Sequence, residues 1–235
     1  MALNKSKGQM YNWVTHTHSH LAGACSHACS YCFVQAMAER FPAMKARYTG
    51  PLRLIEDEFK VNYGSCKTIF VEHMNDLFAE DVPDKFIKRI MNHCQLWPGN
   101  TYVFQTKNPK RYLNPMWVFP ENTILGTTIE TNRIIPNIGS APIPYDRTAA
   151  MIELRRSWPS FRRFVTIEPA LNFDVEILAG WIEMINPEFV NIGADSKNRN
   201  LPEPTVEKVM ALVDKLREYG IELREKHNLQ RLKQK

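Results

Sequence analysis

Short apolar segments alternate with helical segments along the 235-residue chain, and this alternation is the feature that most constrains the fold. The apolar segments are rich in Val, Ile, Phe and Thr, as buried strands are. We expect strands in YNWVTH, KTIFVEHM, TYVFQT, TILGTTIE, RRFVTIEP and FVNIG, and a short seventh strand in IELRE. Repeated strand–helix units form a parallel sheet with helices outside it, which can close or half-close into a barrel.

Polar stretches follow the predicted strands, where a parallel barrel carries its active site. In chain order they are HTHSH, EHMND, KNPKR, ETN, EPALN and ADSKN. The sequence contains no Gly/Ser linker or low-complexity segment. We therefore expect one domain over residues 1–235, with a basic C-terminal tail at about 224–235.

Composition and cysteine content place the chain in a reducing compartment. No apolar run is long enough to span a bilayer, and the N-terminus lacks the apolar core of a signal peptide. We therefore expect a cytoplasmic protein without a membrane partner. The formal net charge of +5 permits a polyanionic partner without requiring one.

Three of the five cysteines, Cys25, Cys29 and Cys32, lie in GACSHACSYC at C-x3-C-x2-C spacing. Three thiolates with one open coordination position suit a [4Fe-4S] cluster whose uncommitted iron binds a small molecule. We expect Cys66 and Cys94 to be buried apolar thiols, and hence no second cluster. A Cys3His zinc site using His27, His20 or His18 is the alternative.

The cysteine spacing, with the aromatic Tyr31 before the last cysteine, resembles the radical S-adenosylmethionine (SAM) superfamily. The resemblance implies a partial (β/α)6 TIM-type barrel, a [4Fe-4S] cluster and SAM as cofactor. The free iron of the superfamily chelates the amino and carboxylate groups of SAM. One electron then cleaves SAM to methionine and a 5′-deoxyadenosyl radical, so an electron donor of flavodoxin or ferredoxin type is an implied partner.

A narrower resemblance covers most of the chain and concerns phage-associated radical SAM proteins that are distantly similar to spore photoproduct lyase. It is carried by NWVTHTHSHLAGACSHACSYC, VEHMNDLF, QTKNP, GTTIETN, FVTIEPAL and NIGADS. The chain departs from that family at LREKHN, where Lys226 takes the place of a family lysine. The implied substrate is a nucleic-acid base or nucleotide, namely a hypermodified thymidine whose amino-acid-like substituent an isomerase rearranges.

The superfamily resemblance also implies a set of cofactor contacts. In the superfamily the segment after the second strand receives the SAM ammonium and the end of the fourth strand holds the ribose. The SAM carboxylate needs a cation, and we expect Lys107, after the third strand, to supply it. The expected cofactor-binding residues are Tyr31, Glu72, His73, Met74, Lys107, Thr128 and Glu130. The alternative for each strand-end residue is a salt bridge at the barrel rim.

Glu168 and Asp195 end the fifth and sixth strands, so both are expected at the barrel mouth as catalytic and substrate-binding carboxylates. In this hypothesis Glu168 holds a substrate amine, and Arg133 or Lys226 holds a substrate carboxylate. The alternative is a structural carboxylate bonded to loop amides.

Arginines and aromatic residues are interleaved in RRSWPSFRR, a composition that suits contact with phosphates and bases but also an exposed helix end. The arginines are Arg155, Arg156, Arg162 and Arg163. Two other functions stay open: a radical SAM enzyme acting on a free small molecule, and a non-catalytic zinc module that binds nucleic acid.

Overall fold

The computed structural model describes residues 3–8, 10–196 and 199–233. The chain divides into two compact units. Unit 1 consists of residues 1–106, 114–124 and 139–141, and unit 2 of residues 107–113, 125–138 and 142–235. None of the helices in the described part of the chain has the length and apolar character needed to cross a membrane.

The main sheet of unit 1 contains, in spatial order, β1 (Asn4–Lys5), β2 (His16–His18), β5 (Thr68–Val71) and β6 (Thr101–Thr106). β2, β5 and β6 run parallel, and β1 is an antiparallel edge. β3 (Leu21–Ala22) and β4 (Arg53–Leu54) form a separate antiparallel pair. Because β5 is buried between two parallel neighbours, nearly all of its residues are apolar.

The helices of unit 1 are α1 (Phe33–Arg40), α2 (Pro42–Tyr48), η1 (Glu56–Lys60) and α3 (Asp84–Gln95). α1 ends just before Pro42, which opens α2, because proline is well accommodated at the first position of a helix. α3 buries Ile87, Ile90 and Cys94 at helical spacing, so one face of this helix packs in the core.

Unit 2 contains β7 (Thr123–Thr128), whose residues from Leu125 belong to this unit, followed in the sheet by β8 (Arg162–Ile167), β9 (Phe189–Ile192) and β10 (Glu222–Glu225). β8, β9 and β10 are parallel. β10 confirms the predicted seventh strand.

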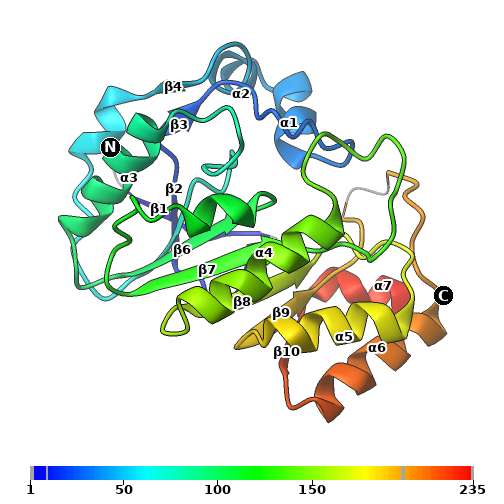
Figure 1. Cartoon of the computed structure of the whole chain (residues 1–235). Coiled ribbons are helices and arrows are strands. Elements are labelled where there is room, and N and C mark those ends of the chain that lie inside the picture. The colour runs from blue at the N-terminus through cyan, green and yellow to red at the C-terminus, as the bar shows by residue number, and fades with distance from the viewer. Residues whose placement is uncertain (1–2, 9, 197–198, 234–235) are drawn as a thin grey trace. The chain divides into compact units, whose positions relative to one another are not determined.

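The helices of unit 2 are η2 (Pro109–Leu113), α4 (Pro144–Ser157), α5 (Val175–Ile185), α6 (Val206–Glu218), η3 (His227–Leu229) and α7 (Gln230–Lys233). α4, α5 and α6 lie side by side along the strands (Figure 1). The Thr205 hydroxyl caps α6, and left-handed Asn186 before Pro187 ends α5.

The first strand lies later in the sequence than predicted. YNWVTH covers residues 11–16, whereas β2 is His16–His18. Tyr11 and Trp13 instead belong to a turn in which their rings stack with centroids 5.3 Å apart, and the Tyr11 hydroxyl donates to Gln105 Oε1 at 2.8 Å. The aromatic residues that indicated a strand therefore pack beside β6 without forming a strand themselves.

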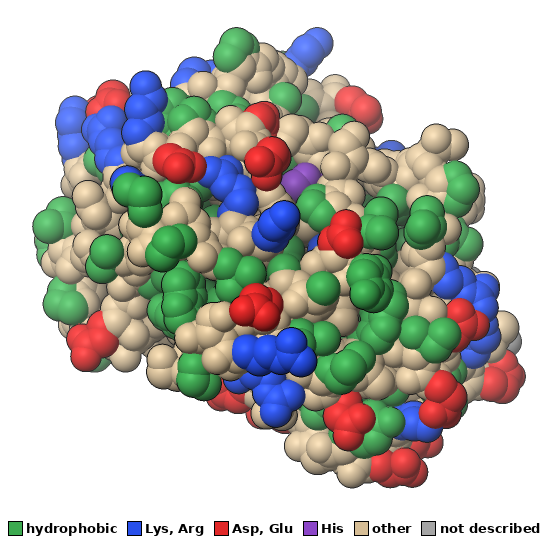
Figure 2. Space-filling view, in the orientation of Figure 1, with side chains coloured by type: hydrophobic (Ala, Val, Ile, Leu, Met, Phe, Trp, Pro, Cys, Tyr) green, Lys and Arg blue, Asp and Glu red, His purple; other side chains and the backbone are tan. Residues whose placement is uncertain are grey.

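The basic C-terminal segment, as far as it is described, folds against unit 2. It comprises β10, η3 and α7, with Leu229 and Leu232 buried and Arg231 paired with Glu203 at 2.8 Å. Acidic and basic side chains are interspersed over α5 and α6 on the face in Figure 2. This surface therefore offers no continuous basic stripe.

Candidate functional site

The three clustered cysteines lie in the loop between β3 and α1 as half-buried thiols, none of them in a disulfide. Two tight turns fold the loop, with the Ala28 amide donating to Cys25 O at 3.3 Å and the Cys32 amide to Cys29 O at 3.0 Å. Ala28 adopts a left-handed φ of 43° to make the first turn. The predicted metal ligands are thus presented by one short, internally bonded loop that fits a three-thiolate cluster site.

Unit 1 fixes this loop through its neighbours. His27 Nε2 lies 2.9 Å from Asp76 Oδ2, and Ser26 donates to Asp81 at 2.6 Å. The Ser140 amide donates to His27 O at 2.7 Å, so the backbone at Gly139 passes directly over the loop. A Cβ at Gly139 would lie 2.6 Å from His27 O, and the φ of 143° there also favours glycine.

We expect Gly139→Ala to displace the cysteine loop and lower the iron content after anaerobic reconstitution. Added bulk at residue 139 pushes against backbone atoms of His27 and Cys29, which have no rotamer by which to escape. Gly180→Ala in α5 is the matched control, because a Cβ there meets nothing within 4 Å. Equal iron in both variants would contradict this close approach.

Burial, with the Asp76 carboxylate as a second cause, raises the pKa of the Cys25 thiol to about 12. Backbone hydrogen bonds from His27 and Asp76 to the sulfur oppose this rise in part. A metal that binds Cys25 near neutral pH must therefore displace the thiol proton.

Glu72 follows β5 and turns its side chain into unit 1. Its carboxylate accepts from the His20 amide at 2.6 Å, the Leu21 amide at 3.1 Å and His20 Nδ1 at 2.8 Å. Glu72 itself has a left-handed φ of 60°, which turns the chain sharply after the strand. The Glu72 carboxylate therefore holds the segment after β2. The next two residues, His73 and Met74, follow the end of β5 and are half-buried. Burial lowers the pKa of His73 to about 4, so this ring is neutral at physiological pH.

Unit 2 brings Lys107 and Glu130 together in an ion pair. Glu130 is 3% exposed and also pairs with Arg147 Nη1 at 2.7 Å. Arg147 donates in addition to the Thr128 carbonyl at 2.9 Å, so the predicted cofactor residues at the end of β7 form one charged network. Sequence reasoning missed Arg147; its signal was helical spacing to the buried Ala150, Met151 and Leu154.

Glu168 and Lys226 also meet in unit 2, at the C-terminal ends of β8 and β10. Lys226 Nζ lies 2.7 Å from Glu168 Oε2, and Asn228 Nδ2 donates to Glu168 Oε1 at 3.1 Å and to Ala194 O at 2.8 Å. Glycine at position 193 leaves room for these side chains, because a Cβ there would lie 2.8 Å from Asn228 Oδ1. Asn228 Oδ1 is buried and lacks a hydrogen-bond partner among the described residues.

Asp195 and Arg133 lie outside that cluster of contacts. Asp195 is buried, and its carboxylate accepts from the Arg199 amide while its own amide donates to Glu203 at 3.2 Å. Arg133 Nε lies 3.0 Å from Asp174 Oδ2 at the start of α5. Hydrogen bonds from Arg133 lower the pKa of Asp174 well below its ordinary value.

A family profile matches residues 9–186, about three quarters of the chain, and its description is protein of unknown function (DUF5131). The chain belongs to the DUF5131 family. No curated protein matches the sequence. The family membership says nothing of phages, so that part of the resemblance stays a prediction.

Solved structures show the fold of this DUF5131 chain. Spore photoproduct lyase, in a mutant with bound AdoMet and dinucleoside spore photoproduct, aligns with a TM-score of 0.59 at 12% identity over 94% of this chain and 80% of the lyase. Streptococcus suis SuiB bound to S-adenosylmethionine aligns with a TM-score of 0.55 at 9% identity over 88% of this chain and 50% of SuiB. Both are radical SAM enzymes, so the DUF5131 chain has the partial TIM-type barrel fold of that superfamily, as predicted.

The arginine-rich stretch of the DUF5131 chain is at the wrong end of its strand to serve a site beside Glu168. Arg162 begins β8 and Glu168 follows it, so the length of the strand, about 20 Å at 3.3 Å per residue, separates them. Arg162 pairs with Glu188 at 2.8 Å, Arg163 donates to the Phe161 carbonyl at 2.6 Å and Arg155 to that of Met184 at 2.8 Å. Each of these three arginines therefore has at least one partner within unit 2.

The histidines proposed for a Cys3His zinc site have other partners. His27 binds Asp76, and His18 and His20 bond to Glu58 and Glu72 respectively. Cys94 is buried as predicted, but the prediction for Cys66 was wrong: it is exposed, at a left-handed φ of 60° in the turn before β5.

Proposed function

We propose that the protein is a radical SAM enzyme that holds a [4Fe-4S] cluster through Cys25, Cys29 and Cys32. The observation that carries this proposal is three thiols, none of them in a disulfide, on one short loop directly after a strand in a fold shared with radical SAM enzymes. When bound, the cluster supplies the electron that cleaves SAM and starts hydrogen abstraction from the substrate. A flavodoxin or ferredoxin is the proposed source of that electron.

The residues of the chain hold and orient the cofactor. Tyr31, beside the last cysteine, lines the cluster loop, and the turn at Glu72, His73 and Met74 offers backbone acceptors for the SAM ammonium. The Lys107–Glu130 network supplies a cation for the SAM carboxylate and acceptors for the ribose, with Thr128 beside them.

For the substrate we propose a nucleic-acid base, namely a phage-type thymidine bearing an amino-acid-like substituent that is rearranged. Such a substituent carries an ammonium and a carboxylate. The Glu168–Lys226 pair offers one partner of each sign, and buried Asn228 Oδ1 adds an acceptor for an N–H group. Asp195 and Arg133 are the remaining candidates for substrate contact. Spore photoproduct lyase, with the same fold, has been solved with a dinucleoside.

A free nucleotide is the second candidate substrate, and the placement of the arginines favours it. Arg162 and Arg163 begin β8, whereas Glu168 ends it, and Arg162 is already paired with Glu188. A base in duplex DNA would in addition have to be flipped out of the stack to reach a barrel mouth.

The decisive test is an anaerobic reaction with SAM, reductant and deuterium-labelled modified thymidines, offered as DNA and as free nucleotides. We expect deuterium in 5′-deoxyadenosine, read by mass spectrometry. Glu168→Gln should lower kcat/KM for the labelled substrate about 10- to 100-fold, the value of a lost charge-assisted hydrogen bond. Glu188→Gln, on the residue that pairs with Arg162, is the control. Absence of deuterium transfer from every modified thymidine would remove this substrate class.

A further inference from the structure

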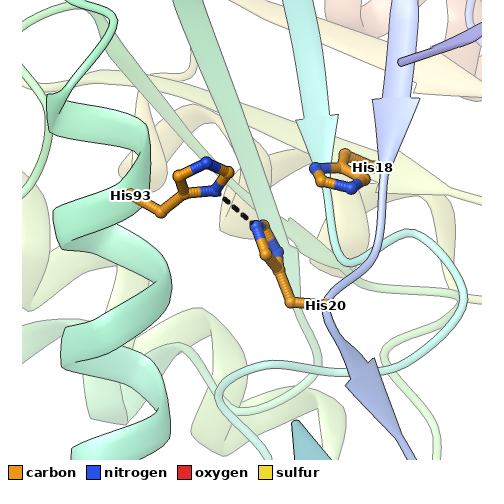
Figure 3. A group of neighbouring side chains, drawn as sticks. All are labelled: His18, His20 and His93. Carbon is orange, nitrogen blue, oxygen red and sulfur yellow. Dashed lines mark hydrogen bonds between the residues drawn. The ribbon is translucent and has the colours of Figure 1, made fainter. Parts of the chain in front are cut away.

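Three histidine rings that are distant in sequence meet inside unit 1 (Figure 3). His18 comes from β2, His20 from the segment after it and His93 from α3. Each is at most 5% exposed, and one nitrogen from each ring lies within 4.8 Å of the others. The three histidines are separate from the thiols of the cysteine loop and are not among the residues assigned to the function proposed above.

The inner nitrogens converge on one another and on a phenol. His20 Nε2 lies 2.8 Å from His93 Nδ1. The fully buried Tyr63 hydroxyl lies 2.5 Å from His18 Nδ1 and 3.1 Å from His20 Nε2. Three nitrogens and one oxygen therefore surround a common point.

The outer nitrogens each face a group that only accepts hydrogen bonds. His18 Nε2 lies 3.0 Å from a Glu58 oxygen and His20 Nδ1 lies 2.8 Å from a Glu72 oxygen. His93 Nε2 lies 3.1 Å from the Val61 carbonyl. Histidines that bind metals characteristically donate their outer N–H to a carboxylate or a backbone carbonyl, which orients the ring and directs the inner lone pair at the metal.

A count of protons indicates that the inner nitrogens of the histidine cluster lack hydrogens to share, so a cation between them would be stabilised. A neutral imidazole has one N–H, and each of these rings uses it on its outer partner. His20 Nε2 and His93 Nδ1 then face each other at 2.8 Å with two lone pairs, and the single Tyr63 proton serves one inner nitrogen at a time.

We propose that this cluster is a structural zinc site with His18 Nδ1, His20 Nε2, His93 Nδ1 and the Tyr63 oxygen as its four ligands. The phenolic proton leaves to solvent as the oxygen binds Zn²⁺. Zn–N bonds of about 2.0–2.1 Å place tetrahedral ligands about 3.3 Å apart, a small outward shift from the hydrogen-bonded contacts. Four protein ligands leave no open position, as in sites that stabilise a fold rather than catalyse.

The surrounding residues are arranged to hold these ligands. Arg47 holds the other oxygen of Glu58 at 2.8 Å, and the backbone amides of His20 and Leu21 hold the Glu72 carboxylate. The ion would thereby join β2, α3 and the segment after η1, three parts of unit 1 that are distant from one another in the sequence.

The test uses the full chain purified from zinc-supplemented medium, as wild type and as the Cys25→Ala/Cys29→Ala/Cys32→Ala variant. We expect elemental analysis to find about one zinc per chain in both proteins, because the proposed site does not use the three thiols. Zinc-edge X-ray absorption on the triple variant should show nitrogen and oxygen at about 2.0–2.1 Å with imidazole outer shells. Folded wild-type and triple-variant protein without stoichiometric zinc would overturn the proposal, as would sulfur at about 2.3 Å in the zinc shell of the triple variant.

A variant pair assigns the ligands. In the triple-alanine background, His93→Gln should lose most of the zinc, whereas His16→Gln, on the same strand as His18 but half-exposed, should keep it. Circular dichroism checks folding. If His93→Gln does not fold, the absorption spectrum of the triple variant decides alone, and full zinc in a folded His93→Gln protein overturns the ligand set.

Discussion

Replacement of any one of Cys25, Cys29 and Cys32 by Ala will reduce the iron bound after anaerobic reconstitution from about four per chain to near zero. A cubane cluster with three protein thiolates has no spare ligand, so losing one thiolate leaves two irons without protein support. Because burial raises the pKa of Cys25, reconstitution of the wild type should also improve as pH rises and the thiol proton becomes easier to displace. The measurements are iron and sulfide per chain and the visible absorbance of the cluster.

Cys66 and Cys94 provide the controls within the same unit. Cys66 is exposed in the turn before β5, and Cys94 is fully buried on α3. Cys66→Ala should leave iron and stability unchanged. Cys94→Ala should cost some stability through lost packing but no iron. Full iron loading in the triple-alanine protein would refute the cluster assignment.

The order of strands and helices was predictable because strands that are buried between parallel neighbours consist mainly of apolar residues, as in TIFV of β5. The sequence signal for β2 was weaker, because its residues His16, Thr17 and His18 are polar. The apolar signal nearby came from Tyr11 and Trp13, which pack without joining the sheet. Local hydrophobicity thus located the core but misplaced the strand beside it.

The cysteine loop was predictable because its three ligands are close in sequence, whereas the histidine cluster was not. His18 and His20 stand together in the polar stretch HTHSH, but His93 lies 73 residues from His20. Only its position three residues after Ile90, on the buried face of α3, indicated that it points inward. Similarly, the burial of Cys66 was predicted from its residue type alone. The neighbouring Gly64 and Ser65 indicated an exposed turn instead.

Glu130→Gln will destabilise unit 2 strongly, whatever its effect on SAM. Glu130 and Arg147 are each about 4% exposed, and the Glu130 carboxylate bridges Arg147 and Lys107. Neutralising it leaves two cations together, one of them buried without its counter-ion. Breaking a buried pair in this way costs about 3–5 kcal/mol in the free energy of unfolding.

The measurement is chemical denaturation of Glu130→Gln beside Glu176→Gln, whose carboxylate pairs with Lys215 at an exposed position. The control should unfold at nearly the wild-type midpoint, because solvent screens surface pairs. A double variant, Glu130→Gln with Arg147→Met, should recover part of the lost stability, since it removes the buried cation as well as the carboxylate. If the double variant is stable and folded but binds SAM as the wild type does, Glu130 is a structural carboxylate. If it is stable and loses SAM, the network at the end of β7 serves the cofactor as well as the fold.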